Sequence, residues 1–312
     1  MKLIGIAGLK KEKFSFLKKK NHKVKLIKIS DENFYKNNNL NALIIFGEWA
    51  VKKKLSKFLR KKFYLFKNLE WVHLSRAGID EFKDSITNYK FKFTCGKKIQ
   101  GPNVSEHCFA LLLNLARGIN GYDKKKFRPT EIYKKNILIT GLGGIGISIA
   151  KKLSAFGAIV SSARLNPKIK YSFVKRNYNI RNLKNIVDRF DIIINTTPLT
   201  DKTINLFNKE IFKNMKKGVF FVNVSRRDVV NLVDLEEYIK KNKFGGVGLD
   251  VHDTKDNFIS KSIKKYNNVI FTNHEGGITT DEIRRFDLLQ KNLNKYIKKQ
   301  DANNIVDIKK QY

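Results

Sequence analysis

The sequence predicts two α/β domains, because short apolar runs alternate with amphipathic segments and the chain is long enough for two hydrophobic cores. The chain has 312 residues, and 42% of them are hydrophobic, which is too many for a disordered protein. An apolar run followed by a segment of helical periodicity is the pattern of a βα unit. Each domain is therefore expected to hold a sheet covered by helices.

The first part of the chain supplies one series of predicted strands and then a long helix. The strands are expected at residues 3–7, 24–29, 42–46, 71–75 and 91–95. Asn103 and Glu106 have the spacing of a capping box at the start of the helix. The helix is expected to bury one apolar stripe, made of Val104, Cys108, Leu111, Leu112, Leu115 and Ile119.

A second series of strands follows, with apolar residues at consecutive positions, as in a parallel sheet covered on both faces. These strands are expected at residues 137–140, 159–162, 192–195, 219–224, 246–251 and 269–272. Helices are predicted between them, for example at 146–156 and 232–241. The last helix is predicted to begin at Thr279, with Glu282 in a capping box and an apolar stripe of Ile283, Phe286, Leu289, Leu293 and Ile297.

The chain is strongly basic, with 64 Lys and Arg residues against 28 Asp and Glu residues and a net charge of +36. Such a charge favours binding to nucleic acid or to an anionic membrane through counterion release. Here the lysines recur along the whole chain, and no helix-turn-helix, zinc-finger or RNA-binding strand pattern accompanies them. We interpret them as solvated lysine-rich faces, predict no nucleic-acid partner, and expect the charge to help attract anionic substrates.

Other features of the composition concern location and metal binding. Cys95 and Cys108 are too few for a disulfide framework and are expected to be small buried residues. The N-terminus reaches lysines too soon for a signal peptide, and no apolar run approaches the ~18 residues of a membrane span. The five histidines lack metal-ligand spacing. The sequence thus predicts a cytoplasmic protein without a metal or membrane partner.

The most informative local motif is the glycine-rich run Gly141-Leu142-Gly143-Gly144-Ile145-Gly146. It follows the predicted strand at 136–140 and precedes a predicted helix at 147–156. In such a motif Gly141 permits a tight turn, Gly143 lets the backbone approach a pyrophosphate, and Gly146 allows close packing of helix on strand. The amides at the start of the helix then face the phosphates, so this run predicts a dinucleotide site.

The end of the next strand bears on the choice of nicotinamide cofactor. An NAD site usually has an Asp or Glu about 20 residues after the glycine turn, for the ribose hydroxyls. Here the strand ends in Arg164, with Lys168 close behind and no carboxylate. Because a cation binds a 2′-phosphate, we predict a preference for NADP(H), with NAD(H) as the other possible cofactor. The alternative is that Arg164 is a surface cation or stacks on adenine without selecting a phosphate.

The order of further motifs around this turn identifies a family. The motifs are 101–107 followed by 110–117, then 196–200 with Thr203, 215–218 leading to 222–226, 246–251, and 272–277. Together they resemble the D-isomer-specific 2-hydroxyacid dehydrogenases, and in particular the glyoxylate and hydroxypyruvate reductases. The resemblance covers roughly residues 69 to 285.

The resemblance implies a particular architecture. A Rossmann domain with a doubly wound parallel sheet, residues 101–284, would be inserted into a smaller flavodoxin-like α/β substrate domain, residues 1–100 plus 285–312. The resemblance also implies a homodimer formed through residues 101–117.

The resemblance also implies roles for individual residues. Arg226 would bind the substrate carboxylate and keto oxygen, and His274 would give a proton to the forming alkoxide. Backbone amides in the turn of Arg76, Ala77 and Gly78 would hold the carboxylate. Asp250 would hydrogen-bond the nicotinamide amide. The other residues implied for cofactor binding are Gly141, Gly143, Gly144, Ile145, Gly146, Arg164, Thr197, Pro198, Thr203, Val224, Ser225 and Gly277.

The sequence departs from the family at two positions near these residues. The family has a catalytic glutamate five positions after Asp250, where this chain has Lys255. We predict Asp256 as the carboxylate that acts on His274 instead, with Asp253 or no residue as the alternatives. Arg227 also stands where the family usually has glycine.

The predicted function is NADP(H)-dependent reduction of a small 2-keto acid, such as glyoxylate or hydroxypyruvate, to its D-2-hydroxy acid. One alternative is a non-catalytic, dinucleotide-sensing protein of the co-repressor type, for which Lys255 and the net charge of +36 are the main support. The other alternative is a phosphoglycerate dehydrogenase, against which the sequence places an acid in Gly47-Glu48-Trp49 where a phosphate would favour cations.

Overall fold

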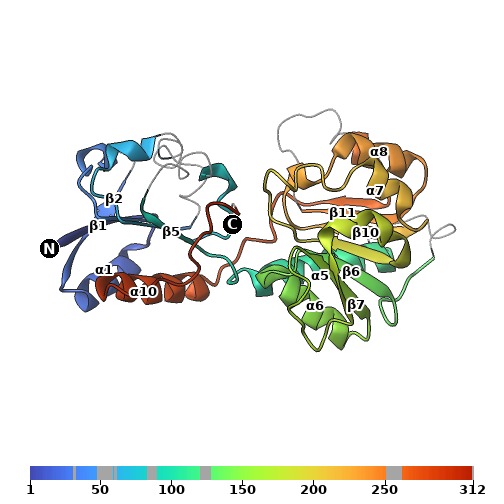
Figure 1. Cartoon of the computed structure of the whole chain (residues 1–312), viewed down its shortest axis with the longest axis horizontal. Helices are drawn as coiled ribbons and strands as arrows, with labels where there is room; N and C mark the ends of the chain where they lie inside the picture. Colours follow the sequence, from blue (N-terminus) through green and yellow to red (C-terminus); the bar gives the residue numbers. More distant parts are fainter. Residues whose placement is uncertain are drawn as a thin grey trace. The chain divides into compact units, whose positions relative to one another are not determined.

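The computed structural model describes residues 1–30, 33–47, 59, 62–82, 90–119, 128–250 and 262–310. The chain forms two compact units, which are seen in Figure 1: unit 1 comprises residues 1–99 and 280–312, and unit 2 comprises residues 100–279. Both termini therefore belong to unit 1, and unit 2 is inserted into it in sequence. The chain returns to unit 1 at Thr280, ahead of the residue 285 expected from the sequence.

Unit 1 contains a five-stranded parallel sheet with the order β2-β1-β3-β4-β5. Its strands are β1 (Lys2–Ala7), β2 (Val24–Ile29), β3 (Ala42–Ile45), β4 (Trp71–Leu74) and β5 (Lys92–Cys95). This is the strand order of flavodoxin-like folds. All five predicted strands are confirmed, with ends that differ by at most one residue.

Among the described elements of unit 1, helices lie on one face of this sheet and short 3-10 turns lie on the other. On the first face lie α1 (Lys11–Lys20) and α10 (Ile283–Ile297), the blue and red helices drawn side by side in Figure 1. Their rings Phe16 and Phe286 are 6.1 Å apart, and Leu289 and Leu293 are fully buried against the sheet. The 3-10 turns are η1 (Phe34–Lys36), η2 (Phe63–Leu65) and η3 (Asp80–Phe82).

The predicted start of the last helix is wrong. The helix α10 begins at Ile283 rather than near Thr279, and Glu282 precedes it without a side-chain capping bond. The Glu282 carboxylate instead pairs with Lys13 of α1 at 3.2 Å. Ile283 is 63% exposed and so lies outside the predicted stripe, because it falls in the first turn beyond the packed face.

Unit 2 contains a seven-stranded parallel sheet with the order β12-β11-β10-β9-β6-β7-β8. Its strands are β6 (Asn136–Thr140), β7 (Ile159–Arg164), β8 (Arg176–Asn179), β9 (Ile192–Asn195), β10 (Val219–Asn223), β11 (Phe244–Leu249) and β12 (Val269–Phe271). The strand order reverses between β6 and β9, which makes the sheet doubly wound, and in such sheets ligands bind at the carboxyl ends of the strands on either side of the reversal. The predicted doubly wound fold is confirmed.

Alternate residues of the strands in unit 2 face two different helical layers. Ile137 and Ile139 of β6 pack with α5 (Gly101–Arg117) and α6 (Gly144–Ala155), while Leu138 packs on the opposite face. The opposite layer is made of α7 (Lys209–Asn214), α8 (Leu232–Lys240), η4 (Ile180–Asn185), η5 (Val187–Arg189) and η6 (Arg227–Val229). Figure 1 shows α5 and α6 on one side of the sheet and α7 and α8 on the other. Burial on both faces explains the continuous apolar runs.

The structure corrects three details of these helices. The helix α5 begins at Gly101, so Asn103 lies inside its first turn and not at the N-cap. Ile119 is 70% exposed, because α5 ends at Arg117 and Gly118 takes a left-handed conformation with φ 65°. The helix α6 begins at Gly144, two residues before the predicted start.

One strand, β8, was not predicted from the sequence. The strand β8 lies at the edge of the sheet, and its sequence, Arg-Asn-Tyr-Asn, has no apolar run. An edge strand has one neighbour and needs little apolar burial, so hydrophobic periodicity does not reveal it.

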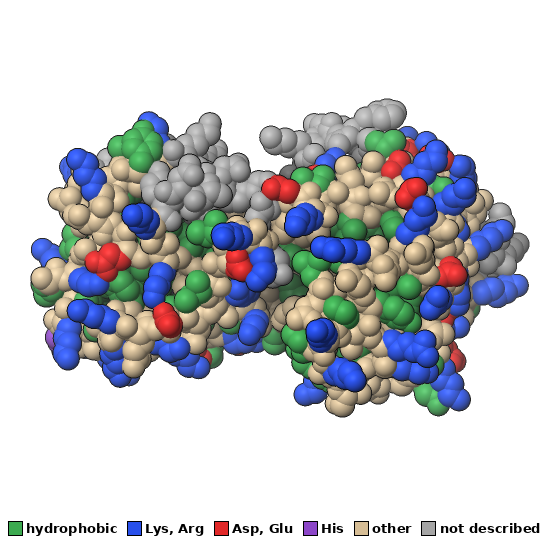
Figure 2. All heavy atoms as spheres, viewed as in Figure 1, with side chains coloured by type: hydrophobic (Ala, Val, Ile, Leu, Met, Phe, Trp, Pro, Cys, Tyr) green, Lys and Arg blue, Asp and Glu red, His purple; other side chains and the backbone are tan. Residues whose placement is uncertain are grey.

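The basic side chains are spread over the described surface. On the face seen in Figure 2, Lys and Arg side chains are scattered over both units and interspersed with apolar and uncharged surface. This agrees with solvated lysine-rich faces, while the absence of a nucleic-acid partner stays a prediction. Among the described residues, no helix has both the length and the apolar character needed to cross a membrane.

Candidate active site

The glycine turn between β6 and α6 has the shape that a dinucleotide requires. Gly141 has φ +81°, and a Cβ on Gly146 would lie 2.3 Å from the Gly141 carbonyl oxygen. These two positions therefore tolerate only glycine, one for its conformation and one for the close approach of α6 to the turn. A Cβ on Gly143 would meet no atom within 4 Å, so the turn is open where a pyrophosphate would approach. The residues present fit a dinucleotide.

The start of α6 adds a favourable electrostatic environment to this turn. Gly143 is its N-cap residue and offers no side chain to satisfy the first backbone amides. Gly144, Ile145 and Gly146 form the first turn of the helix, so their amides point toward the carboxyl edge of the sheet. Unsatisfied amides at a helix N-terminus bind anionic groups, as the sequence analysis expected.

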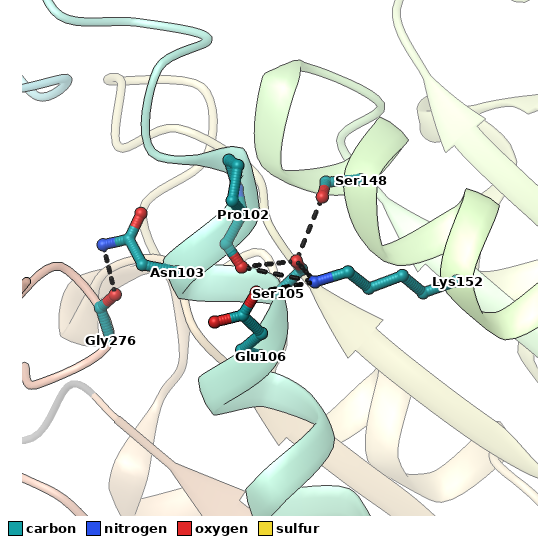
Figure 3. Close-up of polar contacts among 7 residues, drawn as sticks. All are labelled: Pro102, Asn103, Ser105, Glu106, Ser148, Lys152 and Gly276. Carbon is teal, nitrogen blue, oxygen red and sulfur yellow. Dashed lines mark hydrogen bonds and ion pairs between the residues drawn. The ribbon is translucent and has the colours of Figure 1, made fainter. Parts of the chain in front are cut away.

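A polar cluster holds α6 against α5 close to the glycine turn, as Figure 3 shows. The Lys152 ammonium lies 2.7 Å from the Ser105 hydroxyl, which donates to the Pro102 carbonyl at 2.7 Å. The Ser148 hydroxyl is 3.0 Å from that of Ser105. Nearby, a Cβ on Gly101 would lie 2.9 Å from the Gly144 carbonyl oxygen. These contacts fix the position of the α6 N-terminus.

Arg164 lies at the carboxyl end of β7, as predicted. Its side chain is half-buried, and its Nη1 atom is buried without a hydrogen-bond partner among the described residues. The neighbouring Ser162 hydroxyl donates a hydrogen bond to Oδ1 of Asn177 at 2.6 Å. Lys168 is exposed. A buried guanidinium nitrogen that lacks a partner suits an anionic ligand.

The loop after β9 lies directly beside the glycine turn. The Thr196 hydroxyl donates to the carbonyl of Gly141, and the amide of Thr197 donates to the Asn195 side chain at 3.0 Å. The Thr203 hydroxyl donates to the Pro198 carbonyl at 2.7 Å, which closes the loop on itself. Thr197, Pro198 and Thr203 thus share one loop at the sheet's switch point, where the sequence analysis expected cofactor contacts.

Arg226 follows β10 at the same edge of the sheet. Between β10 and Arg226, the backbone amide of Val224 donates a hydrogen bond to the Asn195 carbonyl at 3.2 Å. The guanidinium of Arg226 donates to the Ser225 carbonyl at 2.9 Å, and its own carbonyl accepts from the Asn223 side chain at 3.1 Å. Val224 and Ser225 are buried, while Arg226 is partly exposed. This arrangement holds the backbone of Arg226 at the end of a central strand.

Asp250 immediately follows β11 and is almost completely buried, with 2% exposure. Its Oδ1 accepts from the Thr272 hydroxyl at 2.7 Å and the Glu275 amide at 2.8 Å, and its Oδ2 accepts from the Gly276 amide at 3.1 Å. His107 Nε2 lies 3.1 Å from Oδ1. Protein donors therefore surround the carboxylate for which the family resemblance implied a bond to nicotinamide.

The pair of His107 and Asp250 alters the pKa of both groups. The hydrogen bond to Asp250 raises the pKa of His107, although partial burial opposes it. Burial alone would raise the pKa of Asp250, but the hydrogen bonds from His107 and Thr272 outweigh it and lower that pKa. The pair therefore favours the ionised form of Asp250 and shifts His107 toward its protonated form.

His107 is a site residue that sequence reasoning missed. It lies in α5, and its distance in sequence from the other histidines indicated only that it lacks metal-ligand spacing. The available signal was a histidine next to the apolar stripe of a helix, since such a residue needs a buried polar partner. The partner, Asp250, is far away in sequence, so only the fold reveals it.

His274 lies in the turn after β12, at the same edge as Arg226. Its amide donates to the Asp250 carbonyl at 2.6 Å, and its φ is +59°. A left-handed conformation at a residue other than glycine is strained, and such strain often occurs at functional sites. The same turn contains the exposed His274, the buried Gly276 and the open position Gly277. The Gly276 carbonyl accepts from the Asn103 side chain at 2.9 Å, a contact drawn in Figure 3.

The predicted substrate turn belongs to unit 1. Arg76 pairs with Glu81 at 3.2 Å and donates from Nε to the Gly78 carbonyl at 3.3 Å. Among the described residues, the amides of Ala77 and Gly78 donate to no backbone carbonyl. The turn is held at its base by Gly96, whose amide donates to the Arg76 carbonyl at 2.7 Å. Two amides thus remain available for an acceptor such as a carboxylate.

Three residues of the predicted site lie outside the described part of the chain. Asp253, Lys255 and Asp256 all fall in residues 251–261, which the structure does not describe. The carboxylate that would act on His274 therefore stays a prediction.

The fold and this edge of the sheet define a dinucleotide-binding protein with an arginine and a histidine at the same edge as the glycine turn. Residues 109–276, more than half of the chain, match the family model for the NAD binding domain of D-isomer specific 2-hydroxyacid dehydrogenases. The chain therefore belongs to the D-isomer specific 2-hydroxyacid dehydrogenase family, which confirms the resemblance seen in the sequence.

Individual relatives carry several activities. The chain is 30% identical over 198 residues to a D-3-phosphoglycerate dehydrogenase of Bacillus subtilis, a match covering 59% of this chain and 37% of that protein. It is 28% identical over 204 residues to a glyoxylate reductase of Thermofilum pendens, covering 61% and 60%. These matches span less than two thirds of either relative.

Solved structures show the same fold over the full length. The NADPH-dependent glyoxylate/hydroxypyruvate reductase of Sinorhizobium meliloti matches with a TM-score of 0.81 and 18% identity, covering 100% of both chains. This similarity establishes the architecture of both units.

Proposed function

We propose that this protein reduces a small 2-keto acid of the glyoxylate or hydroxypyruvate type to its D-2-hydroxy acid, with NADP(H) as the preferred cofactor. The observation that carries the proposal is the carboxyl edge of the unit 2 sheet. This edge holds Arg226, Asp250 and His274, which follow the adjacent parallel strands β10, β11 and β12. The same edge holds the glycine turn after β6, which fits a dinucleotide.

Each residue has a proposed task in this reaction. The nicotinamide supplies the hydride when the cofactor is bound. Arg226 binds the substrate carboxylate and polarises the keto oxygen, since its guanidinium offers paired donors and does not titrate. His274 gives a proton to the forming alkoxide oxygen. The turn of Arg76, Ala77 and Gly78 offers backbone amides to the carboxylate.

Asp250 has a proposed positioning task in addition to its expected contact with the nicotinamide amide. Its carboxylate binds the amides of Glu275 and Gly276, and its carbonyl binds the amide of His274. These bonds hold the turn that carries the proton donor. Its bond to His107 keeps the carboxylate ionised, so that it can accept from all of these donors.

The preference for NADP(H) rests on Arg164. Its buried Nη1 lacks a partner among the described residues, and no carboxylate follows β7 to repel a 2′-phosphate. Solved relatives include both a reductase complexed with NADP and a D-lactate dehydrogenase of Aquifex aeolicus complexed with NAD. The cofactor choice is therefore a property to be tested on this chain.

The first experiment follows the oxidation of NADPH and NADH with glyoxylate, hydroxypyruvate, pyruvate and phenylpyruvate between pH 5 and 8. Arg226→Ala should lower kcat/KM by roughly 100- to 1,000-fold, and His274→Ala by roughly 100- to 10,000-fold. Arg181→Ala, at an exposed arginine, is the control and should keep full activity. NADPH binding without turnover of any keto acid would favour the dinucleotide-sensing alternative.

D-3-phosphoglycerate is the second candidate substrate, because the relative in Bacillus subtilis is named for it. It is assayed in the oxidative direction with NADP and NAD. Faster turnover of D-3-phosphoglycerate than of D-glycerate would replace the proposed substrate class while keeping the same site.

The cofactor preference is tested at Arg164. Arg164→Ala should raise the KM for NADPH by about tenfold, the scale of one charge-assisted hydrogen bond, and leave that for NADH unchanged. Lys168→Ala, at an exposed cation, is the matched control. Equal catalytic efficiency of the wild-type protein with both cofactors would disprove the preference.

The proposed carboxylate partner of His274 is tested through the pH profile. Reduction needs a protonated His274, so the rate falls as pH rises through the pKa of this group. A nearby carboxylate raises that pKa, and Asp256→Asn should therefore move the falling limb to lower pH. Asp253→Asn is the control, and a shift in that variant instead would assign the role to Asp253.

A further inference from the structure

Two asparagine side chains form a buried pair below the candidate active site. Asn195 ends β9 and Asn223 ends β10, and they are register partners in the parallel sheet. Asn195 is 0% exposed and Asn223 is 1% exposed. Burying an amide is costly unless its donors and acceptors are satisfied, so this pair calls for a physical reason.

Asn195 links three strands at their carboxyl ends. Its Oδ1 accepts from the Thr140 hydroxyl of β6 at 3.0 Å and from the Thr197 amide at 3.0 Å. Its Nδ2 donates to Oδ1 of Asn223 at 3.0 Å. The side chain therefore spans β6, β9 and β10 at the point where the strand order reverses.

Asn223 continues the same chain of hydrogen bonds toward Arg226. Its Oδ1 also accepts from the Ser225 amide at 3.1 Å, and its Nδ2 donates to the Arg226 carbonyl at 3.1 Å. Each amide thus accepts from one side and donates to the other. The orientation of both side chains follows from this directional order.

A second connection joins the two loops around this pair. The Ser225 hydroxyl donates to the Thr197 carbonyl, and the Thr196 hydroxyl donates to the carbonyl of Gly141. The segment that carries Arg226 is therefore bonded to the loop after β9, which is bonded to the glycine turn. The hydrogen-bonded route is continuous within unit 2.

We propose that Asn195 and Asn223 are positioning residues, which hold the segment of Arg226 in a set relation to the nucleotide-binding turn. This inference rests on the proposed function for the role of Arg226, and it adds the residues that place this arginine. A leucine pair of similar volume would fill the same space, but it would supply neither the bond to the Arg226 carbonyl nor the bonds to Ser225 and Thr197. Misplacement of a reacting group by about 1 Å costs about 100-fold in rate.

The test compares Asn195→Ala and Asn223→Ala with Asn292→Ala. Asn292 is a buried asparagine of unit 1 that donates to the Asn303 carbonyl at 3.1 Å, so its loss lowers stability without touching the pair. We expect Asn223→Ala to lower kcat/KM for the keto acid about 10- to 100-fold, with the Kd for NADPH changed less than threefold. Asn292→Ala should lower the melting temperature without this loss.

A second readout does not depend on catalysis. In Asn195→Ala, backbone amide hydrogen exchange should become faster in residues 224–229, although the substitution lies on the neighbouring strand. Asn195→Ser, which replaces the amide by a smaller polar group, serves if the alanine variant fails to fold. Unchanged exchange in 224–229 would overturn the proposal, whether or not the wild-type protein turns over any keto acid.

The combination of the two substitutions sharpens the test. If the pair acts as one unit, the double variant should lose little more activity than Asn223→Ala alone. Additive losses in the double variant, or an equal loss of activity in Asn292→Ala at the same drop in melting temperature, would assign both residues a purely structural role. Failure of the proposed function itself would instead show as a wild-type protein without turnover but with the expected exchange pattern.

Discussion

The two sheets differ most at the carboxyl ends of their strands. In unit 1 the strands end in Ala7, Ile29, Ile45, Leu74 and Cys95. In unit 2 the ends of β6, β7, β9 and β10 are Thr140, Arg164, Asn195 and Asn223, and Asp250 and Thr272 directly follow β11 and β12. Both sheets are parallel, yet the last residue of every strand of unit 1 is apolar, whereas these four strands of unit 2 end in a polar residue.

The two units hold their buried polar side chains in different places. Buried polar side chains are stabilising only as complete networks, which also fix the geometry of the groups they bind. Unit 2 has such a network beside its glycine turn. In unit 1 the buried polar cluster lies inside the sheet, where the Thr94 hydroxyl is 2.9 Å from both Trp71 Nε1 and His73 Nδ1. The functional groups that we propose for unit 1 are instead the backbone amides of the turn at Ala77 and Gly78.

The largest expected effect comes from adding one methyl group to each unit. A Cβ on Gly146 would lie 2.3 Å from the Gly141 carbonyl oxygen, and a Cβ on Gly96 would lie 2.3 Å from that of Ser75. Gly146→Ala should weaken NADPH binding more than about 100-fold, because the glycine turn must shift. Gly96→Ala should raise the KM for the keto acid and leave the Kd for NADPH unchanged.

Isothermal titration with NADPH and steady-state kinetics measure both effects. Gly143→Ala is the control for the fold, since its Cβ would meet no atom within 4 Å. It should keep the wild-type melting temperature while lowering nucleotide affinity. Loss of NADPH binding in Gly96→Ala would break the assignment of separate tasks to the two units.

A medium effect is expected from the buried histidine of unit 1. Burial lowers the pKa of His73 from 6.5 to about 3. The unfolded chain therefore binds a proton as pH falls below 6.5 while the folded chain does not, and stability decreases. The loss should reach about 2 kcal/mol at pH 5 and vanish above pH 7. His73→Gln should flatten this part of the curve of melting temperature against pH.

The substitution of another histidine controls for this assignment. His22→Gln changes a histidine that is exposed at the start of a turn, and the pH dependence should remain. A His73→Gln variant whose melting temperature falls between pH 7 and pH 5 as steeply as that of the wild-type protein would contradict a neutral, buried His73.

The smallest expected effect concerns the ion pair of unit 2. The pKa of His107 is raised, so its contribution to stability is fully present below pH 6.5 and is lost as pH rises through the folded pKa. The contribution of Asp250, whose pKa is lowered, is present above its unfolded pKa near 3.9 and is lost as pH falls through the folded value. The pair therefore stabilises unit 2 most in the weakly acidic range.

His107→Gln should accordingly lower the melting temperature more at pH 6 than at pH 9. The difference corresponds to about 1 kcal/mol, the scale of a typical intramolecular hydrogen bond. Differential scanning calorimetry at the two pH values measures it. An equal loss at both values would show that His107 contributes only packing.

Most of the fold was accessible from the sequence because its strands are buried on both faces. The runs at 192–195 and 219–224 contain almost only apolar residues, and such runs admit few other structures. The polar edge strand β8 was missed for the opposite reason. Helix ends were less predictable, as at Asn103 and Thr279, since a residue that can cap a helix can equally serve a tertiary contact.

The glycine turn was also accessible, because each glycine performs a task that the chain encodes locally. Gly141 needs a positive φ, and the strand and helix that flank the motif are adjacent in sequence. The family resemblance implied the tasks of Arg226 and His274, since both follow recognisable strand ends. The described residues do not include Asp256, so the carboxylate proposed for His274 rests on sequence alone.

The sequence by itself determined the two α/β domains, the dinucleotide turn and the family. These depend on periodicity, on glycines and on motifs that are short in sequence. The contacts of His107 with Asp250 and of Asn195 with Asn223 are set by the tertiary structure alone. In the sequence, His107 and Asp250 are 143 residues apart, and Asn195 and Asn223 are 28 residues apart. Local physical chemistry makes each polar residue need a partner, but the packing of helices and strands chooses which one it finds.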